Sequence, residues 1–192
     1  MLKDKLGRYH IVLASGSPRR QQFFRDLGLD FEIRLREVDE VFSPHLKHTQ
    51  ITDYLAQLKA NAFDHLAPDE LLITSDTLVW HRGQAVGKPK DAADAFDILK
   101  SLSGSTHEVV TSVCFRTNDR TDIINDTTKV TFKELPDEAI HYYIEAYQPF
   151  DKAGAYGVQE WIGYVAVSRI EGSYTNVMGL PMAKVFDYLN SL

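Results

Sequence analysis

Four carboxylates follow segments of the chain in which a strand is expected to end: Glu37, Asp39, Glu40 and Asp76. Oxygen ligands of this kind bind hard divalent cations such as Mg²⁺, which the phosphates of a substrate also hold. Asp76 directly follows the apolar run at residues 71–75 and is expected to be partly buried. Burial raises the pKa of a carboxyl group toward the range of a general base. The alternative is that all four are ordinary acids of surface loops.

A serine and glycine loop precedes two arginines in the segment Ser-Gly-Ser-Pro-Arg-Arg at residues 15–20. Ser17 is expected to cap a helix that begins at Pro18. The backbone N–H groups of a helix start, together with the guanidinium groups of Arg19 and Arg20, suit a polyphosphate. The segment lacks the Gly-Lys-Ser/Thr of a Walker A loop. A pair of solvated arginines is the alternative interpretation.

Two lysines in glycine-containing loops are further candidates for phosphate binding. Lys88 lies between a glycine and a proline, and Lys152 follows Asp151 in a segment that ends at Gln159. An ammonium group meets a phosphate as a point charge, and a glutamine side chain can both donate to and accept from the edge of a base. Exposed charges in ordinary turns are the alternative. No histidine or cysteine pattern with the spacing of zinc ligands is present.

Composition limits the classes of function. The chain has 192 residues, with 21 Lys and Arg against 27 Asp and Glu, so its formal net charge is −6. A general nucleic-acid binder needs clustered positive charge, and this balance argues against one. The one cysteine excludes an internal disulfide, and no apolar run is long enough to span a membrane. The start of the chain lacks the pattern of a signal peptide. We therefore expect one domain over residues 1–192, in the cytoplasm.

The elements that must position these side chains follow from periodicity. Residues 10–14 are apolar and predict a buried strand, which a loop joins to a helix that ends at Gly28. Residues 31–36 alternate between apolar and charged types, which is typical of a half-exposed strand. Helical spacing of apolar residues over 51–62 places Lys59 on the flank of an amphipathic helix, where a solvated lysine is the alternative.

Later segments predict a different pattern. The strand at 71–75 delivers Asp76 at its end and is followed by a hairpin with its turn at residues 82–83. Two neighbouring strands are expected at 109–115 and 123–132, and hairpin-like strands in the glycine-rich block 154–172. Because helices and strands alternate early and hairpins dominate later, the fold class is α/β with a mixed sheet.

Taken together, these blocks resemble the Maf family of nucleoside triphosphate pyrophosphatases. Their order and spacing span nearly the whole chain, which makes the match specific although each block alone is weak. The matching segments are Leu-Ala-Ser-Gly-Ser-Pro-Arg-Arg at 13–20, Ser-Asp-Thr at 75–77, Gly-Lys-Pro-Lys-Asp at 87–91, Leu-Ser-Gly at 102–104, Asp-Lys-Ala-Gly-Ala-Tyr-Gly-Val-Gln at 151–159 and Glu-Gly-Ser-Tyr-Thr-Asn-Val-Met-Gly-Leu-Pro at 171–181.

The resemblance implies an elongated α/β fold similar to inosine-triphosphate pyrophosphatases, with a nucleotide cleft between two lobes and often a homodimer. It also implies cleavage between the α- and β-phosphates with a divalent cation, Mg²⁺ or Mn²⁺. By match to the family motifs, Asp76 would be the general base, and Glu40 with Asp76 would hold the metal. The residues that would line the triphosphate site are Ser15, Arg20, Lys59, Lys88, Asp151 and Lys152.

Within the family, one branch resembles dTTP/UTP pyrophosphatases and another resembles 7-methyl-GTP pyrophosphatases. Arg19, Thr77 and Gln159 match the specificity positions of the first branch, so the resemblance implies dTTP and UTP, or modified pyrimidine nucleotides, as substrates. One rival hypothesis is a nucleotide-sensing regulator of cell division that acts as a binding module. Another is a purine-type enzyme of the inosine-triphosphate class. The acid at position 76 favours catalysis, because a binding module has no use for a group that activates water.

Overall fold

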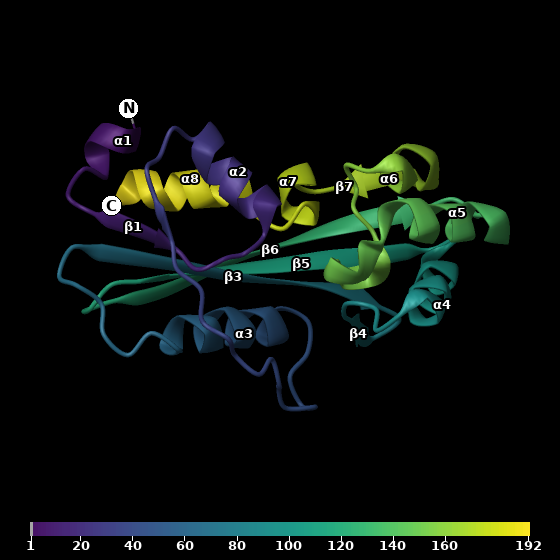
Figure 1. Ribbon diagram of the computed structural model, residues 1–192, viewed down its shortest axis with the longest axis horizontal. Helices are drawn as coiled ribbons and strands as arrows, with labels where there is room; N and C mark the ends of the chain where they lie inside the picture. Colours follow the sequence, from purple (N-terminus) through teal and green to yellow (C-terminus); the bar gives the residue numbers. More distant parts are fainter. Residues whose placement is uncertain (1) are drawn as a thin grey trace. The chain divides into compact units, whose positions relative to one another are not determined.

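The computed structural model describes residues 2–192, and Figure 1 shows the order of its helices and strands. The described residues form two compact units. The first unit contains the described residues up to Asp76 together with 111–126 and 179–192, and the second contains 77–110 and 127–178. Three strands run through both units: β3 (Glu70–His81), β5 (Thr106–Arg116) and β6 (Thr121–Phe132).

The strands of residues 2–192 form one sheet in the order β2-β1-β3-β5-β6-β7, with β4 paired to β3. β1 (His10–Leu13) is parallel to β2 (Glu32–Ile33) and to β3, with Val12 opposite Glu32 and Leu72. β4 (Gln84–Val86) is antiparallel to β3, and β7 (Val167–Glu171) is antiparallel to β6. Parallel and antiparallel pairs in one sheet confirm the predicted mixed α/β class. The turn predicted at 82–83 joins β3 to β4.

In the first unit, helices cover both faces of the sheet. Figure 1 shows α1 (Leu2–Lys5), α2 (Pro18–Asp26) and α8 (Met182–Ser191) on one face and α3 (Thr49–Asn61) on the other. Successive side chains of a strand point to opposite faces, and β1 follows this rule. Ile11 packs with Phe24 of α2, whereas Val12 packs with Ala56 of α3. A strand covered on both faces therefore has an apolar residue at each of its inner positions.

The second unit contains the helices α4 (Ala92–Leu102), α5 (Asp137–Tyr147), α6 (Trp161–Ala166) and α7 (Tyr174–Val177). Short 3₁₀ turns, η1 (Pro149–Asp151) and η2 (Ala153–Ala155), join α5 to the loop before α6.

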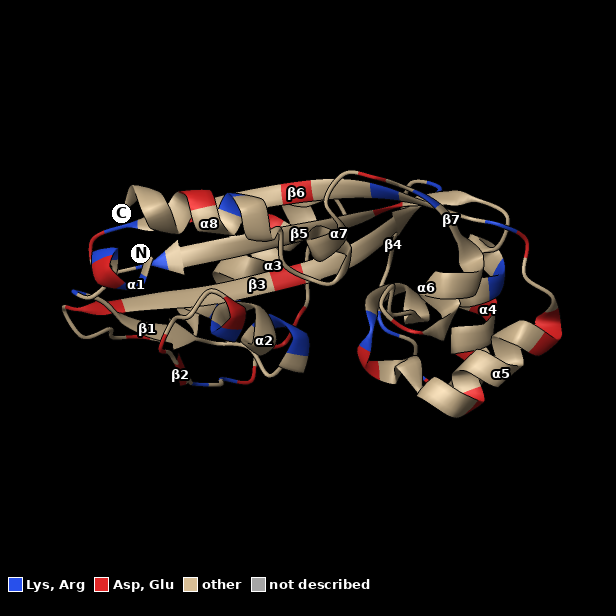
Figure 2. Cartoon of the chain, turned by 90° about the horizontal axis from the view of Figure 1, so that it is seen from above, with Lys and Arg blue, Asp and Glu red and all other residues tan. Residues whose placement is uncertain are grey.

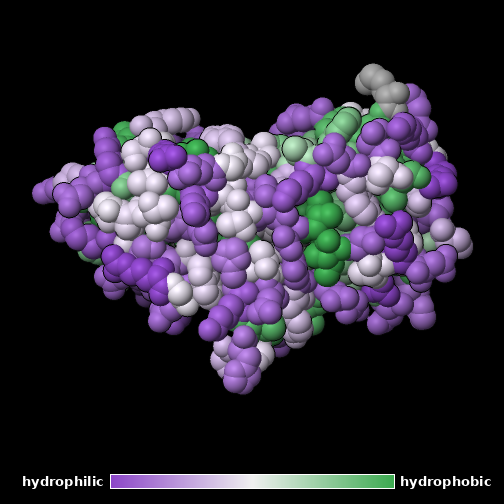
Figure 3. All heavy atoms as spheres, turned by 180° about the vertical axis from the view of Figure 1, so that it is seen from behind, coloured by the Kyte–Doolittle hydropathy of each residue, from purple (hydrophilic) through white to green (hydrophobic). Residues whose placement is uncertain are grey.

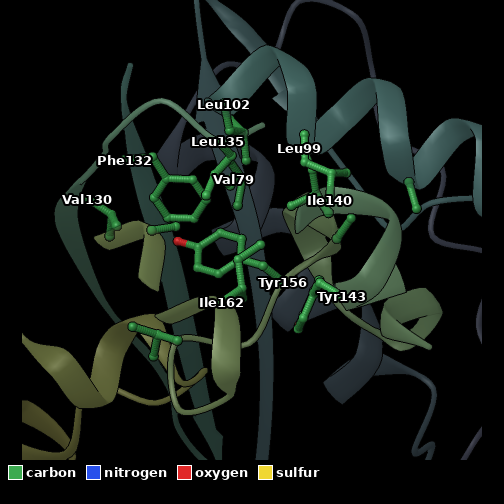
Figure 4. Packing of buried hydrophobic residues seen from close by; sticks show 14 of the residues in the cluster. Val79, Leu99, Leu102, Val130, Phe132, Leu135, Ile140, Tyr143, Tyr156 and Ile162 are labelled. Carbon is green, nitrogen blue, oxygen red and sulfur yellow. The ribbon is translucent and has the colours of Figure 1, made fainter. Parts of the chain in front are cut away.

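Aromatic rings and branched side chains fill the core of the second unit (Figure 4). Tyr143 of α5 and Phe132 of β6 are among its largest fully buried side chains. The rings of Phe132 and Tyr156 meet edge to face, with their centroids 5.0 Å apart. The Tyr156 hydroxyl is satisfied by a 2.8 Å hydrogen bond to Nε2 of the buried His107. Burial lowers the pKa of His107 to about 3, so this core histidine is neutral at physiological pH.

Two local predictions near the start of the chain are partly wrong. The helix begins at Pro18 and ends before Gly28, as predicted, but the Ser17 side chain makes no capping hydrogen bond. The Ser17 N–H instead donates to Ser15 Oγ at 3.3 Å, which holds the loop before the helix. The strand predicted at 31–36 is limited to Glu32–Ile33, because β2 pairs with β1 at only these positions. Glu37, Asp39 and Glu40 therefore lie in a loop rather than at a strand end.

Two further predictions fail for the later segments. β3 continues from Glu70 to His81, so Asp76 lies within a strand and not at its end. The last three residues of β3 pair with β4, and β5 is its neighbour on the side away from β1. In the block 154–172, helix α6 replaces most of the expected hairpin, and β7 is the strand that remains. A Cβ atom at Gly163 would lie 1.8 Å from the carbonyl oxygen of Val158, so this glycine allows α6 to pack against the loop before it.

On the side shown in Figure 3, hydrophilic residues predominate and apolar residues form small groups. For the described residues, this side therefore has no large apolar face. Exposed large apolar side chains are scattered through both units, with Val41 and Tyr164 the most exposed. Among residues 2–192, no helix has the length and apolar character needed to cross a membrane.

Candidate active site

Asp76 is a buried carboxylate within β3, and its side chain is 8% exposed. Side chains of a strand alternate between faces, so Asp76 shares a face with Thr74 and Leu72. That face is covered by α3: Leu72 packs with Ala56, and the Thr74 hydroxyl donates a 2.6 Å hydrogen bond to the Ala56 carbonyl. Figure 2 shows acidic positions along β3 in red, among otherwise uncharged residues. The site is thus built where a strand and a helix meet.

Lys59 is the side chain of α3 that meets this carboxylate. Ile51, Leu55 and Ala56 are buried against the sheet. Lys59 follows Leu55 by four residues and Ala56 by three, so it lies on the same buried face and not on the flank that the sequence predicts. The Lys59 ammonium lies 2.7 Å from Asp76 Oδ1. It also lies 2.9 Å from Oε1 of Glu40, whose side chain is 45% exposed and comes from the loop after β2. The alternative of a solvated lysine is therefore wrong.

Burial governs the protonation of Asp76. Loss of solvent raises the pKa of its carboxyl group above the ordinary value, and the positive charges of Lys59 and Arg20 act in the opposite direction. The nearby Glu40 carboxylate adds a smaller upward shift. A carboxylate with a raised pKa accepts a proton more readily than an exposed aspartate does, which is the property of a general base.

Arg20 is held close to this group by backbone acceptors. Its Nε donates to the Gly179 carbonyl at 2.9 Å, and its Nη1 donates to the carbonyl of Ser75, the residue before Asp76, at 3.2 Å. Loss of solvent lowers the pKa of Arg20 to about 10, so the guanidinium stays charged at neutral pH. Arg19 is half-buried in the same first turn of α2. Ser15 is buried, and its Oγ accepts from the Ser17 N–H.

The remaining predicted residues belong to the second unit. Lys152 is buried, and its ammonium lies 2.7 Å from Oδ1 of Asp151. Lys88 is exposed after β4, and the carbonyl of the preceding Gly87 accepts a 2.9 Å hydrogen bond from the Gly154 N–H. This bond ties the loop of Lys88 to the segment that carries Lys152.

The side chains of Thr77 and Gln159 are half-buried. Thr77 follows Asp76 in β3, and the Gln159 carbonyl accepts a 2.8 Å hydrogen bond from the Tyr164 hydroxyl. The structure thus brings Glu40, Lys59 and Asp76 into direct contact. The roles of the other predicted residues toward a substrate stay predictions.

Two residues of the second unit were not predicted. The Tyr143 hydroxyl donates a hydrogen bond to Oε2 of Glu160, and Oε1 of Glu160 lies 3.3 Å from the Lys152 ammonium. Tyr143 is one of several apolar residues of α5, and Glu160 directly follows the predicted Gln159. No periodicity or motif predicts that Tyr143 and Glu160 are polar partners. Their contact depends on how the loop after Tyr156 folds back toward α5.

The donor set near Lys59 fits a hard divalent cation bound with substrate. Asp76 and Glu40 offer carboxylate oxygens toward one positive group, and Mg²⁺ binds through one or two carboxylates plus substrate phosphates. In the described part of the chain, no three His, Cys, Asp or Glu side chains form a cluster that could hold a metal on their own. The pair therefore fits a metal that arrives with a phosphate ligand better than a metal held by protein alone.

Comparison with known proteins agrees with this architecture. Residues 10–192 match the family described as Maf-like protein. A protein of Flavobacterium johnsoniae named dTTP/UTP pyrophosphatase is 64% identical over 193 residues and covers 100% of both chains. A protein of the same name from Bacteroides fragilis is 48% identical and covers 97% of this chain and 98% of its own length.

A solved structure shows the same fold at low sequence identity. The HAM1 protein from Coxiella burnetii aligns with a TM-score of 0.52 at 14% identity, covering 96% of this chain and 100% of its own. This likeness concerns the fold alone. Because the family match covers residues 10–192 and a relative matches over the full length of both chains, the chain belongs to the Maf family.

Proposed function

We propose that the protein hydrolyses nucleoside triphosphates to the monophosphate and pyrophosphate, with dTTP and UTP as its substrates. The observation that carries the proposal is the buried Asp76 carboxylate in contact with the Lys59 ammonium. Relatives that are 48–64% identical and match over nearly their full length carry the name of this activity. The rival hypothesis of a nucleotide-sensing regulator is not favoured, because no such name occurs among these relatives.

In the proposed reaction Asp76 accepts a proton from a water molecule. The water oxygen forms a bond to the α-phosphorus, the bond from that phosphorus to the bridging oxygen breaks, and pyrophosphate leaves with the electron pair. The raised pKa of Asp76 favours the proton transfer, and the ammonium of Lys59 keeps the base ionised until the proton arrives. The charge on Arg20 stabilises the phosphate oxygens as negative charge shifts toward the leaving group.

The lysines of the second unit serve the phosphates in this proposal. Lys88 and Lys152 neutralise charge on the leaving pyrophosphate, with Asp151 beside Lys152. Thr77, Gln159 and the Arg19 of the first unit select the pyrimidine base, and they are the positions that match the dTTP/UTP branch. A glutamine amide suits this task because it donates and accepts hydrogen bonds.

We also propose that Mg²⁺ or Mn²⁺ acts with the substrate. Asp76 and Glu40 would hold the ion, which would neutralise phosphate charge when bound. Asp76 would then serve both the ion and the water. Lys59 contacts both carboxylates, so it keeps them in place in the protein without nucleotide.

The test is pyrophosphate release from a panel of canonical and modified triphosphates, with Mg²⁺ or Mn²⁺ added. We expect dTTP and UTP to be the best substrates. A folded protein that released no pyrophosphate from any triphosphate would contradict the proposal. Omission of the metal is expected to abolish pyrophosphate release. A control with a chelator removes any metal that was purified together with the protein.

A further inference from the structure

The less exposed carboxylate partner of Lys152 lies outside the predicted site. Lys152 has two carboxylate neighbours: Asp151, whose side chain is 62% exposed, and Glu160, whose side chain is 19% exposed. The Lys152 side chain is itself 9% exposed. An exposed ion pair is weak and mobile, whereas a buried one holds its partners in one geometry. Asp151 is the closer partner, at 2.7 Å against 3.3 Å, but solvent screens the contact with Glu160 less.

Tyr143 fixes Glu160 from the opposite side. Its hydroxyl donates a hydrogen bond to Glu160 Oε2 and accepts a 3.0 Å hydrogen bond from the Gly157 N–H. The ring is fully buried and stacks on Tyr147, with the centroids 5.1 Å apart. Burial and the contact with Glu160 raise the pKa of Tyr143, so its hydroxyl keeps the proton that it donates. One rigid hydroxyl thus contacts both ends of the segment 157–160.

The backbone conformation of residues 157–160 allows Glu160 to contact Tyr143. The Glu160 N–H donates to the Gly157 carbonyl at 3.0 Å, which closes a tight turn. A Cβ atom at Gly157 would lie 2.8 Å from Glu160 Cδ, so a larger residue would push the carboxylate away. The glycine therefore lets the Glu160 side chain fold back between Tyr143 and Lys152.

We propose that Glu160 is a positioning residue for the reaction: anchored by Tyr143, it holds the Lys152 ammonium where the phosphates of the substrate bind. This inference rests on the proposed function for the role of Lys152. A lysine reaches its target through four flexible methylene groups, so its position must be held by a neighbour. Glu160 contacts the ammonium, and in this proposal it acts through Lys152.

A role in phosphate binding predicts a particular kinetic pattern. Every triphosphate carries the same phosphates, so loss of Glu160 is expected to raise KM by the same factor for each nucleotide. Loss of this ion-pair partner predicts an increase of about tenfold in KM for Glu160→Ala, with kcat within about threefold. A change in the Gln159 segment would instead alter the preference among bases.

The experiment compares Glu160→Ala, Glu160→Gln and Tyr143→Phe in pyrophosphate release from dTTP and UTP. Glu160→Gln keeps the length of the side chain and one oxygen that can accept the hydrogen bond from Tyr143, but it removes the charge opposite Lys152. It is therefore expected to raise KM by a smaller factor than Glu160→Ala does. Tyr143→Phe is expected to raise KM by a smaller factor than Glu160→Ala. The matched controls lie on α5 and are exposed: Tyr142→Phe and Glu145→Ala are expected to leave both constants unchanged.

Binding of inorganic pyrophosphate, measured by calorimetry, separates this inference from the proposed function. Glu160→Ala is expected to weaken pyrophosphate binding about tenfold, whether or not the enzyme turns over dTTP. An active wild type with an unchanged KM in Glu160→Ala would overturn the inference alone. A changed base preference with unchanged pyrophosphate affinity would also overturn it. A wild-type protein that neither released nor bound pyrophosphate would overturn both. Thermal unfolding of each variant shows whether it is folded. If Glu160→Ala is not, the same measurements of KM and pyrophosphate affinity on Glu160→Gln decide the outcome.

Discussion

Each unit holds a lysine whose ammonium contacts one exposed carboxylate and one less exposed carboxylate. The less exposed partner of Lys59 is the buried Asp76, and that of Lys152 is the half-buried Glu160. Tyr143 donates a hydrogen bond to Glu160, which fixes that carboxylate in place. Asp76 instead lies where loss of solvent raises its pKa. The same pair of charges thus serves two purposes: one carboxylate holds a lysine, and the other is prepared to exchange a proton.

Removal of the cation from the first unit should have the largest effect. In Lys59→Met, Asp76 and Glu40 lose the ammonium group that contacts both, so the pKa of Asp76 rises further and a larger fraction of the base is protonated at any given pH. We expect kcat/KM for dTTP to fall at least about 10²-fold at pH 7, and the acidic limb of the pH profile to move to higher pH.

The control for this variant is Lys133→Met, because Lys133 is exposed and follows β6. It makes the same chemical change outside the site, and its profile should match that of the wild type. An unchanged acidic limb in Lys59→Met would contradict the coupling of Lys59 to Asp76.

The first half of the candidate site was largely predictable from the sequence. The strand at 10–14, the helix from Pro18 and the helix that carries Lys59 all depend on local periodicity, and the structure confirms them. The flank position predicted for Lys59 is wrong, because Lys59 shares the buried face with Leu55 and Ala56. The contact of Lys59 with Asp76 does not follow from their spacing in the chain, although the family resemblance implies that both belong to one site. Asp76 was assigned to a strand end because its apolar run stops there. The strand continues because β3 also pairs with β5, which follows α4 in the chain, and this pairing is a tertiary effect.

The second half was less predictable. Lys152 and Gln159 were proposed from the glycine-rich motif, but Glu160 and Tyr143 were not. Tyr143 belongs to the apolar face of α5 by its spacing, and nothing in that pattern marks its hydroxyl as a partner of a residue 17 positions later. Hairpin-like strands were expected where α6 forms. The close packing at Gly163 depends on the backbone of Val158, which periodicity does not describe.

The rigidity of the segment before α6 can be tested at Gly163. In Gly163→Ala the added methyl group would overlap the Val158 carbonyl oxygen. We expect a loss of about 1–3 kcal/mol in the free energy of unfolding, measured by urea denaturation. Gly87→Ala is the matched control, because a Cβ there has no neighbour within 4 Å. Equal stability of the two variants would show that this segment adapts, and that it does not hold Glu160 rigidly.

Substitution of Gln159 tests whether recognition of the base is separate from recognition of the phosphates. Gln159→Ala removes an amide that can donate to and accept from a base edge, and leaves the pair of Lys152 and Glu160 intact. We expect the ratio of kcat/KM values among dTTP, UTP and purine triphosphates to change by more than the rate on the best substrate. An equal decrease for all nucleotides would instead assign Gln159 a structural role.

The smallest expected effect concerns stability and pH. The Asp76 carboxyl group has a higher pKa in the folded protein than in the unfolded chain, where its pKa is 3.8. It therefore stabilises the fold most at pH values below 3.8, where it is protonated. This contribution is lost as pH rises through the pKa of the folded state. Asp76→Asn carries no such charge. We therefore expect its melting temperature, relative to the wild type, to be higher at pH 8 than at pH 4. A relative melting temperature that fell as pH rose would contradict the raised pKa.

The role of Asp76 is tested most directly by pyrophosphate release from dTTP and UTP, compared between the wild type and Asp76→Asn, with nucleotide affinity measured in parallel. If Asp76 is the general base, the variant should lose at least about 10²-fold in kcat and keep its affinity within a few-fold. Asp64→Asn, an exposed aspartate outside the site, should behave as the wild type does. Turnover retained in Asp76→Asn would remove this residue from the role of base and would contradict the account.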